Sequence, residues 1–181
     1  MNNNFITYGK PNFDYNEINK VKTVLKSGWA GTGKKTKIFE NNFLKYKKAK
    51  YGIALNSCTS AIHLALILSD IGKGDEVIVT SLTFCSTINT IINVGAKPVL
   101  IDIKLDDLQI NEDLIEKKIT KNTKAILIVH MHGYSCNMNK ILSIKNKYSL
   151  KLIEDCAHAI ETKYRNKHVG NFGDFGCFSF Y

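Results

Sequence analysis

The chain has 181 residues, of which 44% are hydrophobic and 23% charged, so it is long enough to bury a core and has the composition of a soluble globular protein. No apolar run could cross a bilayer, and the first residues lack the basic and apolar regions of a signal peptide, so we expect a cytoplasmic protein without a membrane partner. The formal charge of +9 would suit a nucleic-acid partner, but Arg165 is the only arginine, and we predict instead a solvated, lysine-rich surface.

Hydrophobic periodicity predicts two helices in the first 50 residues, over residues 14–26 and 38–46. From residue 51 onwards, short apolar runs alternate with amphipathic stretches. The expected strands are residues 51–56, 76–80, 99–102, 125–130, 152–155 and 177–180, and the expected helices are residues 60–69, 86–94, 111–118 and 139–148. This alternation predicts an α/β fold with a mainly parallel sheet between helices.

Ligands of such sheets bind beyond the carboxyl ends of the strands, where Ser57, Thr83 and Asp155 are expected. The turn Ser57-Cys58-Thr59-Ser60 leads from an expected strand into an expected helix. The free N–H groups at a helix N-terminus can bind a phosphate, and small hydroxyl residues can equally cap the helix. Capping is the plainer interpretation of the turn taken by itself.

Two adjacent acids, Glu154 and Asp155, end a buried strand. Because side chains alternate along a strand, the two acids should point to opposite faces, and one should reach the crevice at the sheet edge. A carboxylate there can hold a ring nitrogen protonated, since an opposite charge favours the charged form of each partner. An isolated acid at this place would more simply be a helix cap or a surface residue.

Three other patterns are near misses. Gly28, Gly33 and Lys34 have Walker spacing, but Lys35 stands where Ser or Thr should bind magnesium and the segment follows a helix, which excludes an NTPase loop. The five scattered cysteines form no CxxC pair, which favours reduced thiols. The spacing of the potential zinc ligands fits no strong signature, so we expect no metal site; these residues are His130, His132, Cys136 and His158.

Taken together and in order, the segments between about Gly9 and Tyr181 resemble the DegT/StrS-type sugar aminotransferases, which use pyridoxal phosphate (PLP). The resemblance rests on residues 27–33, 39–40, 56–66, 72–79, 81–84, 94–99, 129–130, 154–158 and 173–180. It implies an aspartate-aminotransferase-like fold (PLP fold type I). Residues 51–181 would be the PLP-binding α/β large domain, truncated and without its C-terminal domain. Residues 1–50 would be an N-terminal helical segment that contributes to the active site and a dimer interface.

The resemblance also implies roles for individual residues. The turn of residues 57–60 would bind the PLP phosphate through backbone amides, together with a serine after the last strand. An aromatic ring would stack on the pyridine, an aspartate would pair with its nitrogen, and a histidine would orient it. The implied cofactor-binding residues are Ser57, Cys58, Thr59, Ser60, Phe84, Asp155, His158 and Ser179; the implied catalytic residues are Asp155 and His158; the implied substrate residues are Trp29, Thr32 and Gly33.

The activity implied is transfer of an amino group, usually from L-glutamate, to a keto sugar carried on a nucleotide, within a homodimer, for surface polysaccharide or glycan synthesis. The lysine that would carry PLP follows the Ser-Phe pair in this family and is expected just beyond Tyr181. Two alternatives stay open. A histidine in place of that lysine would indicate a PMP-dependent sugar dehydratase, and a true stop after Tyr181 would indicate a non-catalytic cofactor-binding remnant.

Overall fold

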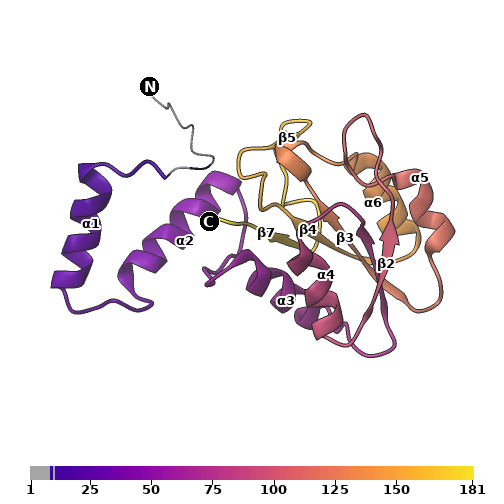
Figure 1. Ribbon diagram of the computed structural model, residues 1–181, viewed down its shortest axis with the longest axis horizontal. Coiled ribbons are helices and arrows are strands. Elements are labelled where there is room, and N and C mark those ends of the chain that lie inside the picture. The colour runs from indigo at the N-terminus through magenta and orange to yellow at the C-terminus, as the bar shows by residue number, and fades with distance from the viewer. Residues whose placement is uncertain (1–8, 10) are drawn as a thin grey trace, which may run out of the picture. The chain divides into compact units, whose positions relative to one another are not determined.

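The computed structural model describes Gly9 and residues 11–181, which fall into two compact units (Figure 1). The first unit ends at Asn42, and the second runs from Phe43 to Tyr181. Helix α2 (Lys34–Lys47) begins in the first unit and ends in the second. Each unit is described by itself.

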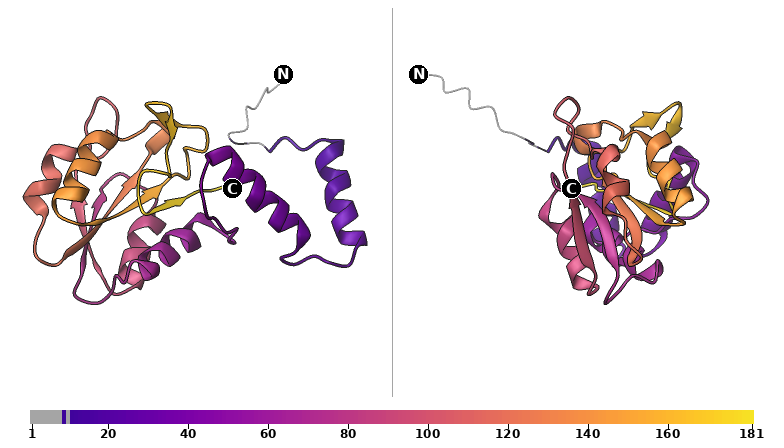
Figure 2. Two further views of the ribbon diagram at one scale, coloured as in Figure 1. Left: turned by 180° about the vertical axis from the view of Figure 1, so that it is seen from behind. Right: turned by 90° about the vertical axis from the view of Figure 1, so that its right-hand side faces the viewer.

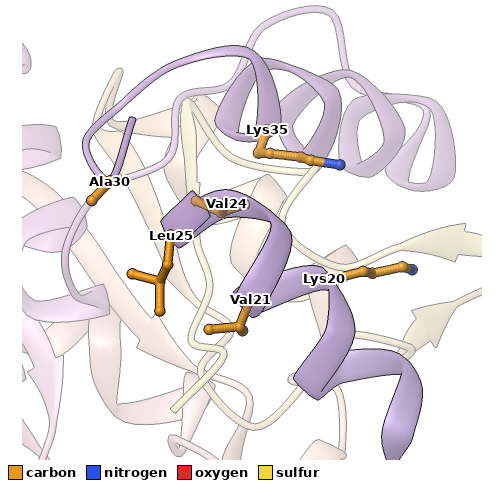
Figure 3. A pocket seen from close by; sticks show the side chains of 6 residues that line it. All are labelled: Lys20, Val21, Val24, Leu25, Ala30 and Lys35. Atoms are coloured by element: carbon orange, nitrogen blue, oxygen red, sulfur yellow. The ribbon is translucent and has the colours of Figure 1, made fainter. Parts of the chain in front are cut away.

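The first unit contains helix α1 (Tyr15–Lys26), which starts at a capping box. The Asp14 side chain accepts the N–H of Asn16, and the Glu17 carboxylate accepts the N–H of Asp14 at 2.9 Å. The helix buries none of its residues. A hollow at its C-terminal end is lined by Lys20, Val21, Val24, Leu25, Ala30 and Lys35 (Figure 3).

The second unit is built on a parallel sheet in the order β2-β1-β3-β4-β7 (Figure 1). Its strands are β1 (Glu76–Thr80), β2 (Lys97–Ile101), β3 (Thr123–Val129), β4 (Lys151–Asp155) and β7 (Phe175–Cys177). A two-stranded antiparallel ribbon, β5 (Lys163–Tyr164) with β6 (Lys167–His168), lies outside this sheet. All five strands of the sheet run the same way, so their carboxyl ends form one edge.

Helices cover both faces of the sheet (Figure 2). On one face, α3 (Cys58–Leu68) and α4 (Cys85–Asn93) pack Ile62, Leu66 and Ile91 against alternate residues of β1, β3 and β4. On the other, α5 (Glu112–Ile115) and α6 (Met138–Lys147) contribute Ile115, Met138, Ile141 and Ile144. Two 3₁₀ turns, η1 (Glu116–Lys118) and η2 (Met131–Gly133), complete the elements. The predicted α/β architecture is confirmed. No helix among the described residues has the length and apolar character needed to span a membrane.

Two predicted strands are wrong. Residues 51–56 form no strand, although the run is apolar, because no described strand lies beside it to supply ladder hydrogen bonds. Its side chains are consequently open to solvent, with Tyr51 79% and Ile53 65% exposed. The last strand is Phe175–Cys177 and not residues 177–180, because β4 ends at Asp155 and offers pairing only as far as Cys177. The β5–β6 ribbon was not predicted from the sequence.

Lys47, at the C-terminal end of α2, is a buried lysine, 2% exposed. Its ammonium donates to the backbone oxygen of Ile160 at 3.0 Å and lies 4.4 Å from the centre of the Phe178 ring. Burial lowers the pKa of Lys47, and the nearby Cys156 and Glu154 only partly offset this. The charged form is therefore held at a cost that a neutral side chain of the same length would avoid.

We expect Lys47→Met to raise the free energy of unfolding by about 1 kcal/mol at neutral pH, since an apolar chain of similar volume removes a buried charge. Because the pKa of Lys47 is lower in the folded state, the unfolded state binds more protons as pH approaches 10.5, and the advantage of the variant should shrink over that range. Urea denaturation of both proteins at neutral and alkaline pH measures this. A methionine variant less stable than the parent at neutral pH would contradict it.

Candidate functional site

Asp155 lies at the carboxyl end of β4, on the face covered by α3 and α4, and is 4% exposed. Its Oδ2 accepts the hydroxyl of Thr87 at 3.0 Å, and its Oδ1 accepts the N–H of Ala157 at 3.1 Å. The Thr87 hydroxyl in turn accepts that of Thr83 at 2.8 Å. This relay joins the turn after β1 to the turn after β4, and its donors all point toward the carboxylate.

Burial raises the pKa of Asp155, and the Ala157 N–H, the Thr87 hydroxyl and the nearby histidines offset this only in part. Among the described residues, Asp155 forms hydrogen bonds but has no cation at contact distance. A cationic N–H placed against it would relieve the burial penalty. The site therefore suits a ligand with a protonated ring nitrogen.

The turn before α3 lies beside Asp155. Ser57 is the N-cap of α3, and its hydroxyl accepts the N–H of Ser60 at 3.1 Å. The helix capping expected from the turn by itself is therefore present, and it uses the N–H of Ser60. The N–H groups of Cys58 and Thr59 belong to the first turn, where a helix supplies no backbone acceptor. The Cys58 thiol lies 3.9 Å from Asp155 Oδ1, and burial together with that carboxylate raises the pKa of Cys58 to about 12. The thiol is thus protonated at neutral pH.

The remaining predicted cofactor residues follow the carboxyl ends of β1, β4 and β7. Phe84 is the N-cap residue of α4, four residues after the end of β1, and is 73% exposed. His158 follows Asp155 by three residues and is also exposed. Ser179 lies two residues beyond β7, and its hydroxyl accepts the N–H of Tyr181. An exposed ring, a buried carboxylate and a helix N-terminus therefore occur at one edge of the sheet.

The three predicted substrate residues lie in the first unit, away from this edge in the sequence. The Trp29 indole donates to the backbone oxygen of Thr32 at 2.9 Å, which closes the turn before α2. A Cβ at Gly33 would collide with the indole, so glycine is needed there. These contacts explain the local sequence, and a role of the segment in substrate binding stays a prediction.

Glu154, the other acid, has a different environment. It is fully buried on the opposite face of β4, and its oxygens accept the N–H groups of Gly170 at 2.8 Å and of Phe172 and Gly173, both at 2.7 Å. His130 Nε2 lies 3.0 Å away and donates the fourth hydrogen bond, because His130 Nδ1 accepts the N–H of Cys136. Burial alone would raise the pKa of Glu154, but the bonds from His130 and the backbone outweigh it and keep the pKa low.

These contacts also explain the one group of potential metal ligands among the described residues. Ligand atoms of His130, Glu154 and Cys156 lie within 4.8 Å of one another. The carboxylate oxygens and His130 Nδ1 already accept protein hydrogen bonds, and burial raises the pKa of the Cys156 thiol far above its usual range. The cluster is therefore a clamp that holds residues 170–173 against β4.

Sequence reasoning missed two residues at this edge. Thr87, the third residue of α4, bonds to Asp155, and a threonine on an apolar helix face was the signal for it. His132 lies in η2 and stacks on His158, with ring centres 5.8 Å apart and planes at 11°. Two histidines after neighbouring strands could have indicated this pair.

The family model described as the DegT/DnrJ/EryC1/StrS aminotransferase family matches residues 11–181. The chain belongs to this family. It is 44% identical over 179 residues to the spore coat polysaccharide biosynthesis protein SpsC of Bacillus subtilis, an alignment that covers 99% of the chain and 46% of SpsC. The resemblance stated from the sequence is confirmed.

Two solved structures of aminotransferases match the fold. The aminotransferase from Psychrobacter cryohalolentis superposes with a TM-score of 0.91 at 38% identity, over 94% of this chain and 44% of that one. The putative sugar aminotransferase Spr1654 from Streptococcus pneumoniae, in its PMP form, gives 0.93 at 33% identity, over 97% and 48%. The aspartate-aminotransferase-like large-domain fold is thereby confirmed. The chain spans about half the length of these relatives.

Proposed function

We propose that the protein takes part in PLP-dependent transfer of an amino group, with L-glutamate as donor, to a keto group of a nucleotide-linked deoxysugar. The observation that carries the proposal is Asp155 at the carboxyl edge of the sheet, a buried carboxylate that no cation from residues 11–181 contacts. The family of the chain supports the reaction class, and the polysaccharide role named for SpsC supports a sugar acceptor.

The donor set of this edge fits PLP. Asp155 would accept the N–H of the pyridinium ring and keep it protonated. The N-terminus of α3, an 11-residue helix, with Ser57, Cys58, Thr59 and Ser60, would hold the phosphate, as anions bind at helix N-termini. Phe84 would lie against the ring, and Ser179 would add a hydroxyl to the phosphate.

When bound, PLP supplies an electron sink for the carbanion formed at the substrate carbon. The residues of this chain would orient it. The hydroxyls of Thr83 and Thr87 would hold the Asp155 carboxylate in its orientation toward the cofactor ring. His158 would offer one ring N–H to the cofactor. Trp29, Thr32 and Gly33 would contact the substrate in the assembled homodimer. A cytoplasmic location, where nucleotide sugars are made available, completes the proposal.

The test uses the full-length protein. We expect it to bind PLP with a characteristic absorbance band. On addition of L-glutamate without a sugar, the bound PLP should be converted to PMP in one turnover, with one 2-oxoglutarate formed for each PMP. A protein that binds PMP but does not react with glutamate would support the dehydratase alternative. Failure to bind either vitamer would contradict the proposal.

A further inference from the structure

The loops that follow β2, β3 and β4 meet at the carboxyl edge, and Gln109 joins the first two. Gln109 is 1% exposed. Its side-chain Nε2 donates to the backbone oxygen of Met131 at 3.2 Å, and its Oε1 accepts the N–H of the same residue at 3.2 Å. One amide thus fixes both peptide groups of Met131, the residue directly before His132.

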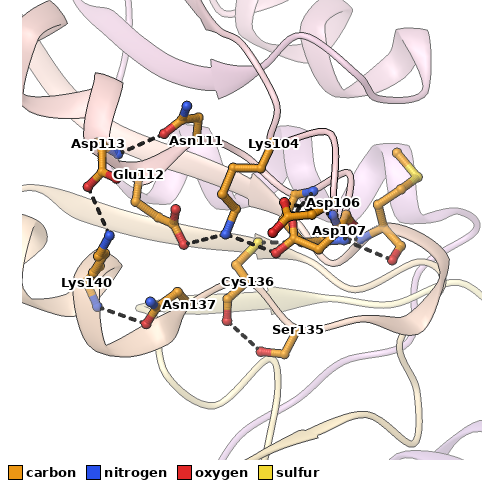
Figure 4. A network of polar contacts seen from close by, with 12 residues as sticks. Lys104, Asp106, Asp107, Asn111, Glu112, Asp113, Ser135, Cys136, Asn137 and Lys140 are labelled. Carbon is orange, nitrogen blue, oxygen red and sulfur yellow. Dashed lines mark hydrogen bonds and ion pairs between the residues drawn. The ribbon is translucent and has the colours of Figure 1, made fainter.

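The loop that carries Gln109 is itself cross-linked. Lys104 Nζ lies 2.9 Å from Asp107 Oδ2 and 3.1 Å from Glu112 Oε1, and Figure 4 shows the lysine between the two acids. The N–H of Gln109 donates to Asp107 Oδ1 at 2.9 Å. Glu112 is 2% exposed, so this ion pair is shielded from solvent on one side. Gln109 is therefore presented from a rigid loop.

The loops after β3 and β4 are joined at His132. This residue has a φ of 53°, in the left-handed region, and its N–H donates to His158 Nδ1, 3.4 Å away. The two rings lie parallel. The hydroxyl of Thr162 donates to the backbone oxygen of Gly133 at 2.6 Å, a second bond between the same two loops.

This arrangement determines where His158 carries its proton. Since Nδ1 accepts the backbone N–H of His132, the neutral ring is protonated on Nε2, and Nε2–H is its one donor. We propose that Gln109 and His132 are positioning residues, which fix the ring orientation and tautomer of His158 and so present a hydrogen-bond donor to the cofactor. The proposal rests on the proposed function for the presence of PLP, but the tautomer itself is a property of the protein alone.

The test is ¹⁵N NMR of the full-length protein, labelled at histidine and free of cofactor. The His158 signals are assigned as those that disappear in the His158→Gln variant. We expect the parent to hold His158 as the Nε2–H tautomer. Gln109→Met removes both bonds to Met131 and should give a mixture of tautomers and about tenfold weaker PLP binding. His132→Asn keeps a residue that tolerates the left-handed conformation and keeps the backbone N–H that donates to His158 Nδ1, but it removes the ring contact. It should therefore leave the Nε2–H tautomer in place and broaden the His158 ring signals.

Thr123→Val is the matched control. Thr123 is a buried hydroxyl at the opposite end of β3, where it accepts the N–H of Thr120 at 2.9 Å, so its loss should lower stability without changing the His158 signals. A parent that shows the Nδ1–H tautomer, or two loop variants with unchanged His158 signals, would overturn the inference. If the parent binds no PLP, the proposed function fails, while the tautomer measurement still decides the positioning role.

Discussion

Asp155→Asn should raise the stability of the cofactor-free protein and strongly weaken PLP binding. The variant keeps the hydrogen bonds, because the asparagine oxygen can accept the Ala157 N–H and the Thr83–Thr87 hydroxyls can reverse their donor direction. It removes a buried charge, and the free energy of unfolding should rise by about 1 kcal/mol at neutral pH. Removing one partner of a buried ion pair costs about 3–5 kcal/mol, so PLP affinity should fall more than a hundredfold.

The pH dependence gives a second check on Asp155. Its pKa is raised in the folded state, so the folded protein holds the proton more tightly than the unfolded chain as pH rises above 3.8. Stability at this site is therefore lost as pH rises through the folded pKa, and the gain from asparagine should vanish toward pH 3.8. Thermal melts of the cofactor-free proteins from acid to neutral pH measure it.

Asp102→Asn is the control, since it makes the same change in net charge at the same edge of the sheet. Asp102 is exposed and accepts the N–H of Ile103 at 2.8 Å. We expect it to change the free energy of unfolding by less than about 0.5 kcal/mol, as is usual for surface substitutions, and PLP affinity by less than about twofold. An Asp155→Asn variant with parental PLP affinity would remove Asp155 from the site.

Glu154→Leu should be the most destabilising substitution in the second unit that we can name. It leaves three backbone N–H groups of residues 170–173 and the Nε2–H of His130 without an acceptor in a buried place. The expected loss is about 3–5 kcal/mol, a large part of the stability of a typical domain. Glu154→Gln should cost less, because its oxygen still accepts two N–H groups, but its NH₂ group then faces two donors. Urea denaturation of the three proteins measures the difference.

The acid side of the pH profile separates the two neighbouring acids. The pKa of Glu154 is lowered by folding, so its contribution is complete above 4.5 and is lost as pH falls through the folded pKa. This sign is opposite to that of Asp155. Glu116→Gln, which breaks an exposed pair with Lys147 at 3.2 Å, should change stability by less than about 1 kcal/mol and serves as the control. Equal losses for Glu154→Leu and Glu116→Gln would contradict the clamp.

The sequence by itself determined the alternation of helices and strands from residue 58 onwards, because buried parallel strands and amphipathic helices carry strong, different periodicities. It also predicted that Glu154 and Asp155 face opposite sides, which follows from strand geometry alone. The order of motifs was enough to place the chain in its aminotransferase family. Strand pairing failed at residues 51–56, since an apolar run indicates burial but does not show whether a neighbour exists.

Only the tertiary structure showed that Glu154 bonds to the protein itself while Asp155 faces the candidate cofactor site. Only the packing of β4 between two helical layers shows that Glu154 meets four protein donors while Asp155 meets Thr87 and the N-terminal turn of α3. Cys58 precedes Asp155 by 97 residues, and His130 precedes Glu154 by 24. No local sequence pattern encodes these pairs. The same holds for His132 and Gln109. Their positions depend on loops from separate strands, which come together only when the parallel sheet brings its carboxyl ends to one edge.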